Sequence, residues 1–243
     1  MRLLFALFAA LACGSALAQA DIEAIDRGVL VPALRLSFDI AGELAPGQGP
    51  AVPHSGHGIE LGLSGASGED TQSFGAGNGP AVFGGRVFNP GELHHEFDFR
   101  FFEVAYRFRH FFGESKTFGI EALGGLGFAE FELTTSSATQ SASEKMSSGG
   151  LVGGFGIIWK FLPAASLQSR LSIFASGDQE GVTAAARVDV NLAYALARNI
   201  ALRGGLVSWG LVSARAEANN STSFDSRIRA GFSGLLLGLD VAF

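Results

Sequence analysis

The sequence predicts an all-β fold, an up-and-down antiparallel transmembrane β-barrel, and three observations support it. Only 16% of the 243 residues are charged and the mean hydropathy is +0.29, whereas a soluble domain carries about a quarter charged residues. After the extreme N-terminus no apolar run of about 18 residues, the length of a spanning helix, is found. Short alternating segments instead recur to the last residue. A hydrophobic chain without a spanning helix is left with the closed barrel as its membrane fold.

The first 20 residues have the pattern of a secretory signal peptide. Met1-Arg2 supplies the charged start, an apolar run covers 3–12, and Ala18-Gln19-Ala20 is an A-x-A cleavage site. We therefore expect residues 1–20 to be removed, 21–27 to form a periplasmic N-terminal tail and 28–243 to form the barrel. The single cysteine, Cys13, lies within this signal, which leaves a lipidation site there as the alternative.

The C-terminal element is the most regular. Within 231–243 the odd positions carry the large apolar side chains and end on Phe243, while the even positions are mostly small or polar. This period of two is that of a strand with one apolar face. Preceding strands are predicted at 200–216, 182–196, 166–176, 148–161, 117–134 and 95–109.

The connections between these strands alternate in length. Polar stretches at 217–225, 176–181 and 135–148 are expected as long loops, and those at 197–199, 162–166 and 110–116 as shorter turns. Long loops on one side and tight turns on the other are typical of outer-membrane barrels, with the tight turns in the periplasm. The last strand then runs down to the periplasm.

Two strand counts are open near the N-terminus. Strands are predicted at 35–44 and around Ile59, Leu61 and Leu63. An even count with both chain ends in the periplasm requires one more strand between Ser73 and Phe88, which makes ten. Eight is the alternative, if 66–94 is one glycine-rich loop.

The two faces of these strands differ in chemistry. Charges in lipid cost about 2–4 kcal/mol each at the midplane, so the charged phase is expected to face the lumen and to pair across it. Besides Glu43, Asp98, Arg100, Arg109, Glu121 and Arg170, the expected lumen charges are Arg35, Asp39, Glu103, Arg107, Arg187, Asp189, Arg203 and Asp240. The alternation slips at 101–102, 129–131 and 204–205, where β-bulges are predicted.

Aromatic residues are expected to mark the periplasmic membrane interface. Four of them fall in the apolar phase near the lower end of a downward strand: Tyr106, Trp159, Tyr194 and Phe243. Trp209 does not fit this girdle.

The chain end resembles the C-terminal signal of bacterial outer-membrane β-barrels, through Gly238, Val241 and the terminal Phe243. In that class the barrel-assembly machinery reads this strand. The stretch 190–209, VNLAYALARNIALRGGLVSW, resembles the strand–turn–strand of small porin-family and OmpA-transmembrane-like barrels. The stretch 97–128 is more distantly similar to Legionella-type pore-forming major outer-membrane proteins. These resemblances imply an outer-membrane protein that contacts lipid and lipopolysaccharide and uses the assembly machinery.

Catalytic motifs are absent from the sequence. It contains no G-x-S-x-G, G-x-x-x-x-G-K-[ST] or H-E-x-x-H pattern. The acidic and Asp–His pairs of barrel proteases and the His–Ser site of lipid A deacylases have no match either. Four histidines, His54, His57, His94 and His95, lie in two loops that the ten-strand topology places on one rim, where they are weak metal-ligand candidates.

The function expected from the sequence is a structural or surface-interaction role of an integral outer-membrane barrel. Its lumen is expected to be narrow and charge-filled, because interiors near eight strands are filled by side chains. A pore for small solutes is the alternative, and an enzyme is the weakest reading. No cofactor is expected, and the net charge of −6 gives no sign of a nucleic-acid partner.

Overall fold

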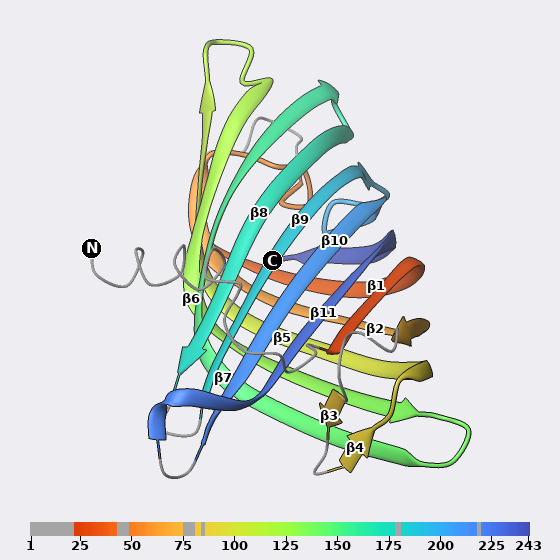
Figure 1. Ribbon diagram of the computed structural model, residues 1–243. Helices are drawn as coiled ribbons and strands as arrows, with labels where there is room; N and C mark the ends of the chain where they lie inside the picture. Colours follow the sequence, from red (N-terminus) through yellow and green to blue (C-terminus); the bar gives the residue numbers. More distant parts are fainter. Residues whose placement is uncertain (1–21, 43–48, 75–80, 84–85, 178–180, 218–219) are drawn as a thin grey trace.

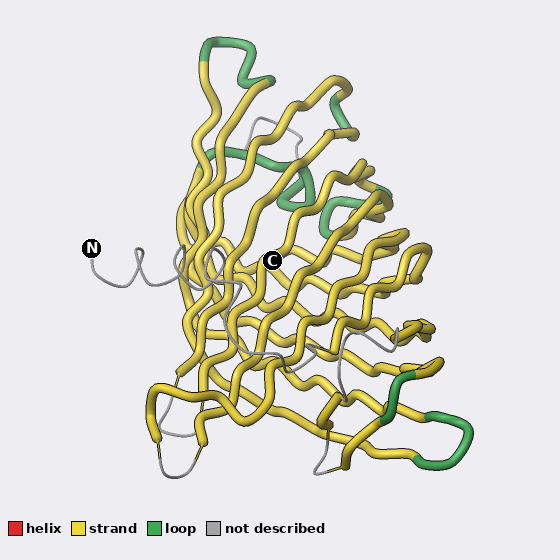
Figure 2. Tube along the Cα trace, in the orientation of Figure 1, coloured by secondary structure: helices red, strands yellow, loops and turns green. Residues whose placement is uncertain are grey.

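The computed structural model describes residues 22–42, 49–74, 81–83, 86–177, 181–217 and 220–243. Their regular structure is β-strand throughout (Figures 1 and 2). None of the described residues forms a helix long and apolar enough to cross a membrane. The strands are β1 (Ile22–Gly42), β2 (Gly56–Phe74), β3 (Ala81–Phe83), β4 (Arg86–Phe88), β5 (Gly91–Phe112), β6 (Phe118–Ser136), β7 (Ser141–Leu162), β8 (Ala165–Gly177), β9 (Gly181–Ala195), β10 (Ile200–Glu217) and β11 (Asn220–Ala242).

Nine of the described strands close one barrel, in the order β1-β11-β10-β9-β8-β7-β6-β5-β2. Neighbours along the chain pair antiparallel, which confirms the up-and-down all-β fold. An odd number of alternating strands leaves the first and last pointing the same way, and β1 does pair parallel with β11. Gly234 lies at this seam, where a Cβ would run into the backbone of Val29.

The parallel seam places the start of β1 and the end of β11 at opposite ends of the barrel. Ile22 pairs with Ile228, whereas Ser37 pairs with Ala242. The expectation that both chain ends lie on one side is therefore wrong for the barrel strands. Residues 22–27, expected as a tail, are part of β1, and the signal-peptide segment with Cys13 lies outside the described residues.

The tenth strand expected between Ser73 and Phe88 is a short hairpin instead. Strands β3 and β4 pair only with each other and form a separate two-stranded sheet. The eight-strand alternative also fails, because β2 continues to Phe74 and β5 begins at Gly91, in full register with each other.

Several polar stretches expected as loops are strand. β6 and β7 continue to Ser136 and from Ser141, so the predicted loop 135–148 shrinks to 137–140. Likewise, β10 and β11 take up most of 217–225. The ladders contain no register shift at the three predicted bulges, near Phe101, Ala129 and Gly204. The shifts fall elsewhere, for example between Arg27 and Val29.

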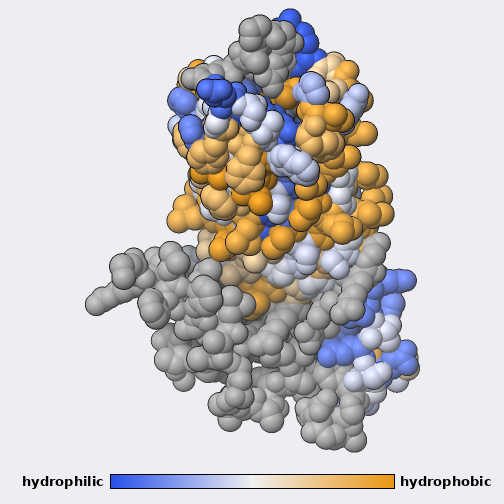
Figure 3. Space-filling view, turned by 90° about the horizontal axis from the view of Figure 1, so that it is seen from above, coloured by the Kyte–Doolittle hydropathy of each residue, from blue (hydrophilic) through white to orange (hydrophobic). Residues whose placement is uncertain are grey.

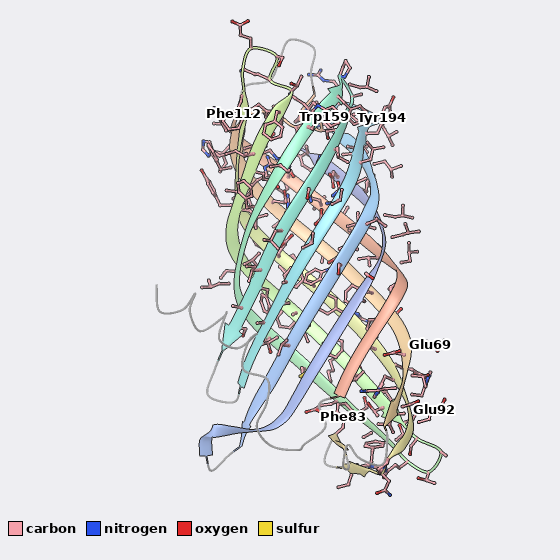
Figure 4. The ribbon with its side chains drawn as sticks, turned by 45° about the horizontal axis from the view of Figure 1, so that its top comes forward. Glu69, Phe83, Glu92, Phe112, Trp159 and Tyr194 are labelled. Carbon is pink, nitrogen blue, oxygen red and sulfur yellow. The ribbon has the colours of Figure 1, made fainter. Side chains whose placement is uncertain are left out.

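Two ends of the barrel are used below as reference. The short-turn end holds the connections 113–117, 163–164 and 196–199 together with the chain terminus at Phe243. The hairpin end holds β3, β4 and the turn 137–140. Figure 4 shows Phe112, Trp159 and Tyr194 at the short-turn end and Glu69, Phe83 and Glu92 at the hairpin end.

Candidate functional site

The outer face of the barrel is apolar in the half next to the short-turn end, which we call the belt half. Outward side chains in 102–112 of β5, 118–128 of β6 and 151–161 of β7 are all apolar or glycine except His110. Eleven residues is the length of a membrane-spanning strand. In Figure 3 hydrophobic residues cover much of the described wall that the view shows. Phe102 and Phe112 mark the two edges of this belt on β5, and Phe128 and Phe118 mark them on β6.

The outer face of the other half, the hairpin half, is polar on β5, β6 and β7. On β5 the outward residues there are Glu92, His94, Glu96, Asp98 and Arg100. Arg100 pairs with Asp98 at 3.1 Å, and their side chains are 71% and 47% exposed. The expectation that Asp98 and Arg100 face the lumen is therefore wrong. The alternation continues unbroken through this point, and what changes is the chemistry of each face.

The lumen of the hairpin half is filled with aromatic rings. Phe99 and Phe101 each lie 5.0 Å from Trp209 between ring centroids, and Phe232 lies 5.4 Å from Phe99. Phe97 extends the column toward the hairpin end by packing against Phe232 at 5.7 Å. All of these rings are buried. Trp209, which did not fit the girdle, belongs to this core.

The lumen of the belt half holds a network of charges. Its centre is Glu60, only 1% exposed, whose carboxylate lies 3.2 Å from Arg35 Nε and 2.6 Å from Arg170 Nη1. Arg107 Nη1 lies 3.8 Å from the same carboxylate. The pair Glu60–Arg170 joins β2 to β8 across the barrel, and Arg170 also pairs with Glu121 at 2.5 Å.

The network reaches from the centre of the belt half to the short-turn end. Arg107 pairs with Asp39, and Asp39 lies 3.1 Å from His54 Nε2. Further ion pairs join Arg109 to Glu121, Arg187 to Asp189, and Asp240 to both Arg35 and Arg203. Eight of the predicted lumen charges also face inward: Arg35, Asp39, Glu103, Arg107, Arg187, Asp189, Arg203 and Asp240. Glu43 lies outside the described residues.

Glu103 is placed by a glycine on the neighbouring strand. A Cβ at Gly62 would lie 2.6 Å from Glu103 Oε1 and 2.8 Å from its Cγ. The absence of a side chain at Gly62 therefore makes the room in which this buried carboxylate folds against the wall. Gly62 and Glu103 are register partners in β2 and β5.

The two faces exchange polarity within a few residues on β5. The last outward charge is Arg100 and the first outward belt residue is Phe102. The last inward ring is Phe101 and the first inward charge is Glu103. The belt half is apolar outside and charged inside, which is the pattern of a membrane barrel. The hairpin half is polar outside and apolar inside, which is the pattern of a barrel in water.

Both ends of the lumen are covered. At the short-turn end, the segment 49–55 lies across the mouth: Ala51 N donates to Arg198 O at 3.0 Å, and Val52 and His54 are buried. At the hairpin end, Phe83 and Phe88 of the β3–β4 hairpin are 1% exposed and belong to the apolar core. The turn 137–140 contributes one bond, from Gln140 Nε2 to Val87 O at 2.7 Å.

The predicted girdle and the terminal strand lie on the outer face of the belt half. Trp159, Tyr194 and Phe243 lie near strand ends, and at least half of each side chain is exposed. Tyr106 lies six positions before the end of β5, deeper in the belt. Phe243 stacks on Phe38 with centroids 5.2 Å apart, and its backbone N donates to Ser37 O at 2.9 Å. Val241 continues the outward apolar row, and Gly238 faces Arg203 in the lumen.

The four candidate histidines do not come together. His54 and His57 lie at the short-turn end, whereas His94 and His95 begin β5 at the hairpin end. No cluster of His, Cys, Asp or Glu suited to a metal is found among the residues that the structure describes. His95 is fully buried, its Nδ1 is 2.9 Å from Thr135 Oγ1, and burial lowers its pKa, with His94 acting in the same direction and the Asp70 carboxylate opposing.

Sequence reasoning missed the most connected lumen residue, Glu60. A signal was present, because Ile59, Leu61 and Leu63 lie on the apolar face and Glu60 has the opposite phase.

No protein-family model, curated protein or solved structure matches the chain.

Proposed function

We propose that the chain is an integral outer-membrane β-barrel with a structural or surface-interaction role. The observation that supports this is the reversal of polarity between the two halves. A belt of outward apolar side chains about eleven residues deep matches the hydrocarbon thickness, and the hairpin half would stand in water as a barrel with its own core. Outer-membrane lipid and lipopolysaccharide are then its surroundings, and the barrel-assembly machinery inserts it.

The proposed orientation places the short-turn end in the periplasm and the hairpin half outside the cell. Short turns and the C-terminal strand end support this direction, because outer-membrane barrels have short periplasmic turns. The outward face of the hairpin half would then be the surface that meets partners. In this orientation β1 starts at the cell-surface side.

A single-cysteine labelling experiment tests both placement and direction. In the Cys13→Ala background, Ser143→Cys should react with a membrane-impermeant maleimide on intact cells. Ser115→Cys, in the turn 113–117, should react only after the outer membrane is permeabilised, and Leu237→Cys should react in neither case. The reverse order for Ser143 and Ser115 would invert the orientation. Recovery of the protein in the soluble periplasmic fraction would overturn the membrane proposal.

The pore alternative is not supported by a particular observation. The belt-half lumen is crossed by ion pairs, the hairpin-half lumen is packed with rings, and barrels of this size are filled by side chains. Refolded protein in a planar bilayer should therefore show no stepwise conductance. Regular single-channel steps would replace the structural role by a pore.

A further inference from the structure

The apolar lumen of the hairpin half ends in side chains that the barrel itself does not supply. Phe83 and Phe88 come from a hairpin that pairs with no barrel strand, yet both are 1% exposed and part of the core. The described residues give this hairpin a single side-chain hydrogen bond to the wall, from Gln140 to Val87 O. Two rings from a segment outside the barrel ladder therefore close an apolar compartment.

The same end of the lumen contains buried polar atoms without a hydrogen-bond partner. They are Nε2 of His95 and Oε2 of Glu144. His95 pairs with Thr135 and Thr135 with Ala142, so Glu144 lies one inward position further along β7. An unpaired buried polar group costs roughly 1–3 kcal/mol, and such groups in a native protein call for an explanation. A hydroxyl group bound at either atom would satisfy it.

We infer that the hairpin-half lumen binds the hydrocarbon chain of a small neutral amphiphile, with a hydroxyl head group at His95 and Glu144, and that Phe83 and Phe88 occupy the site in its absence. The walls nearest the hairpin supply the apolar surface, through Leu93, Phe97 and Leu133. A hydroxyl group both donates and accepts, so it suits either an imidazole nitrogen or a carboxylate oxygen. A fatty acid is disfavoured, because its carboxylate would meet those of Glu144 and Asp70.

The site is for capture and not for passage through the barrel. Beyond Phe101 the lumen changes to the ion-pair network around Glu60. A hydrocarbon chain that entered this network would separate buried ion pairs and leave charges without partners, which is costly. The inference rests on the proposed function only in that the hairpin end faces water.

Tryptophan fluorescence of the full chain in lipid vesicles tests the site, with a long-chain alcohol brominated at the chain end as the quenching probe. Trp159→Phe leaves Trp209 in the aromatic column, and Trp209→Phe leaves Trp159 on the outer belt as the matched control. Quenching of Trp209 should saturate and be reversed by the unbrominated alcohol, while quenching of Trp159 should rise only with partitioning into lipid. Equal, non-saturating quenching of both would overturn the site.

Two further variants test displacement of the rings. Phe83→Ala/Phe88→Ala should tighten probe binding about tenfold, because the rings no longer compete. If that variant does not fold, Phe88→Trp in a Trp159→Phe/Trp209→Phe background gives the same information, since its emission should shift to the red as the alcohol displaces it. An unshifted emission under saturating alcohol would overturn the role of the hairpin.

The head group is tested separately. His95→Phe should weaken alcohol binding about 2- to 10-fold, the range of one hydrogen bond, and the matched brominated fatty acid should bind less tightly than the alcohol. Tighter binding of the acid would overturn the assigned head group. Failure of the chain to form a heat-modifiable barrel in vesicles would count against the proposed function, whereas an inserted barrel without saturable quenching counts against this inference alone.

Discussion

The two halves of the barrel are made by the same strands with the same alternation, and they differ in which face is apolar. On β5, Phe97, Phe99 and Phe101 point inward, while Phe102, Val104 and Phe108 point outward. Alternation with a period of two residues shows only that the two faces of a strand differ. The solvent on each side decides which face carries the apolar residues. The belt half places charges in its interior, and the hairpin half places them on its outer face.

The largest expected loss of stability comes from truncating one central side chain in the lumen of each half. Glu60→Ala leaves Arg35, Arg107 and Arg170 short of a buried partner and should cost about 3–5 kcal/mol. Phe99→Ala in the other half should cost a similar 3–5 kcal/mol, by opening a cavity in the aromatic column. Urea unfolding in vesicles measures both.

Conservative substitutions should distinguish the two interiors. Glu60→Gln keeps the volume and loses only the charge, so it should remain strongly destabilising, while Phe99→Leu should recover much of the packing. Glu132→Ala, on the outer face of the hairpin half, is the control and should leave stability unchanged. A nearly neutral Glu60→Ala would mean that the ion-pair network does not hold the belt half together.

Arginine scanning of the outer face comes next in size. Leu237→Arg, in the belt, should reduce the free energy of insertion by about 2–4 kcal/mol, the cost of an arginine on a lipid-facing strand. Ser147→Arg, outward in the hairpin half, should be tolerated, since it meets water there. The fraction of heat-modifiable barrel after refolding measures each. Equal tolerance at the two positions would remove the distinction between the halves.

The terminal residue is expected to matter more in cells than in the refolded barrel. Phe243→Ala removes the stack on Phe38, but 59% of the side chain is already exposed, so the cost should be about 1–2 kcal/mol. The backbone bonds with Ser37 and Asp39 remain. Deletion of Phe243 should sharply reduce assembled barrel in cells, while the refolding yield in detergent is nearly retained. A parallel fall in both would make Phe243 a packing residue only.

Alternation alone was enough to predict the all-β barrel and the inward phase of residues such as Arg107, Asp189 and Arg203. It is not enough for residues 95–101, because there the charged phase is the outer phase and not the lumen phase. The aromatic residues Phe97, Phe99 and Phe101 then required a bulge that the structure lacks. The assumption that every strand has an apolar outer face predicts loop at 135–136 and 141–148, because these strand ends have none, yet their backbones pair in full register.

The strand count and the partners across the lumen depend on three-dimensional closure. The segment that holds Phe83 and Phe88 has strand composition, and nothing local to it indicates that it folds inward as a hairpin. The parallel pairing of β1 with β11 follows from the odd number of strands and from no local signal. Glu60 meets Arg170 although they are 110 positions apart in the chain.

The smallest expected effect concerns the pH response of the hairpin half. The pKa of His95 is lower in the folded protein than its ordinary value near 6.5, because burial disfavours the imidazolium. Between those two pKa values the unfolded chain binds the proton and the folded chain does not, so stability is complete above the unfolded value and declines as pH falls below it. The slope for one proton is at most about 1.4 kcal/mol per pH unit. His95→Gln should flatten the dependence of unfolding on pH below 6.5, and His110→Gln, on the outer belt, is the control. If the free energy of unfolding of His95→Gln falls with pH as steeply as that of the unmodified chain, the pH response comes from other groups and not from protonation of His95.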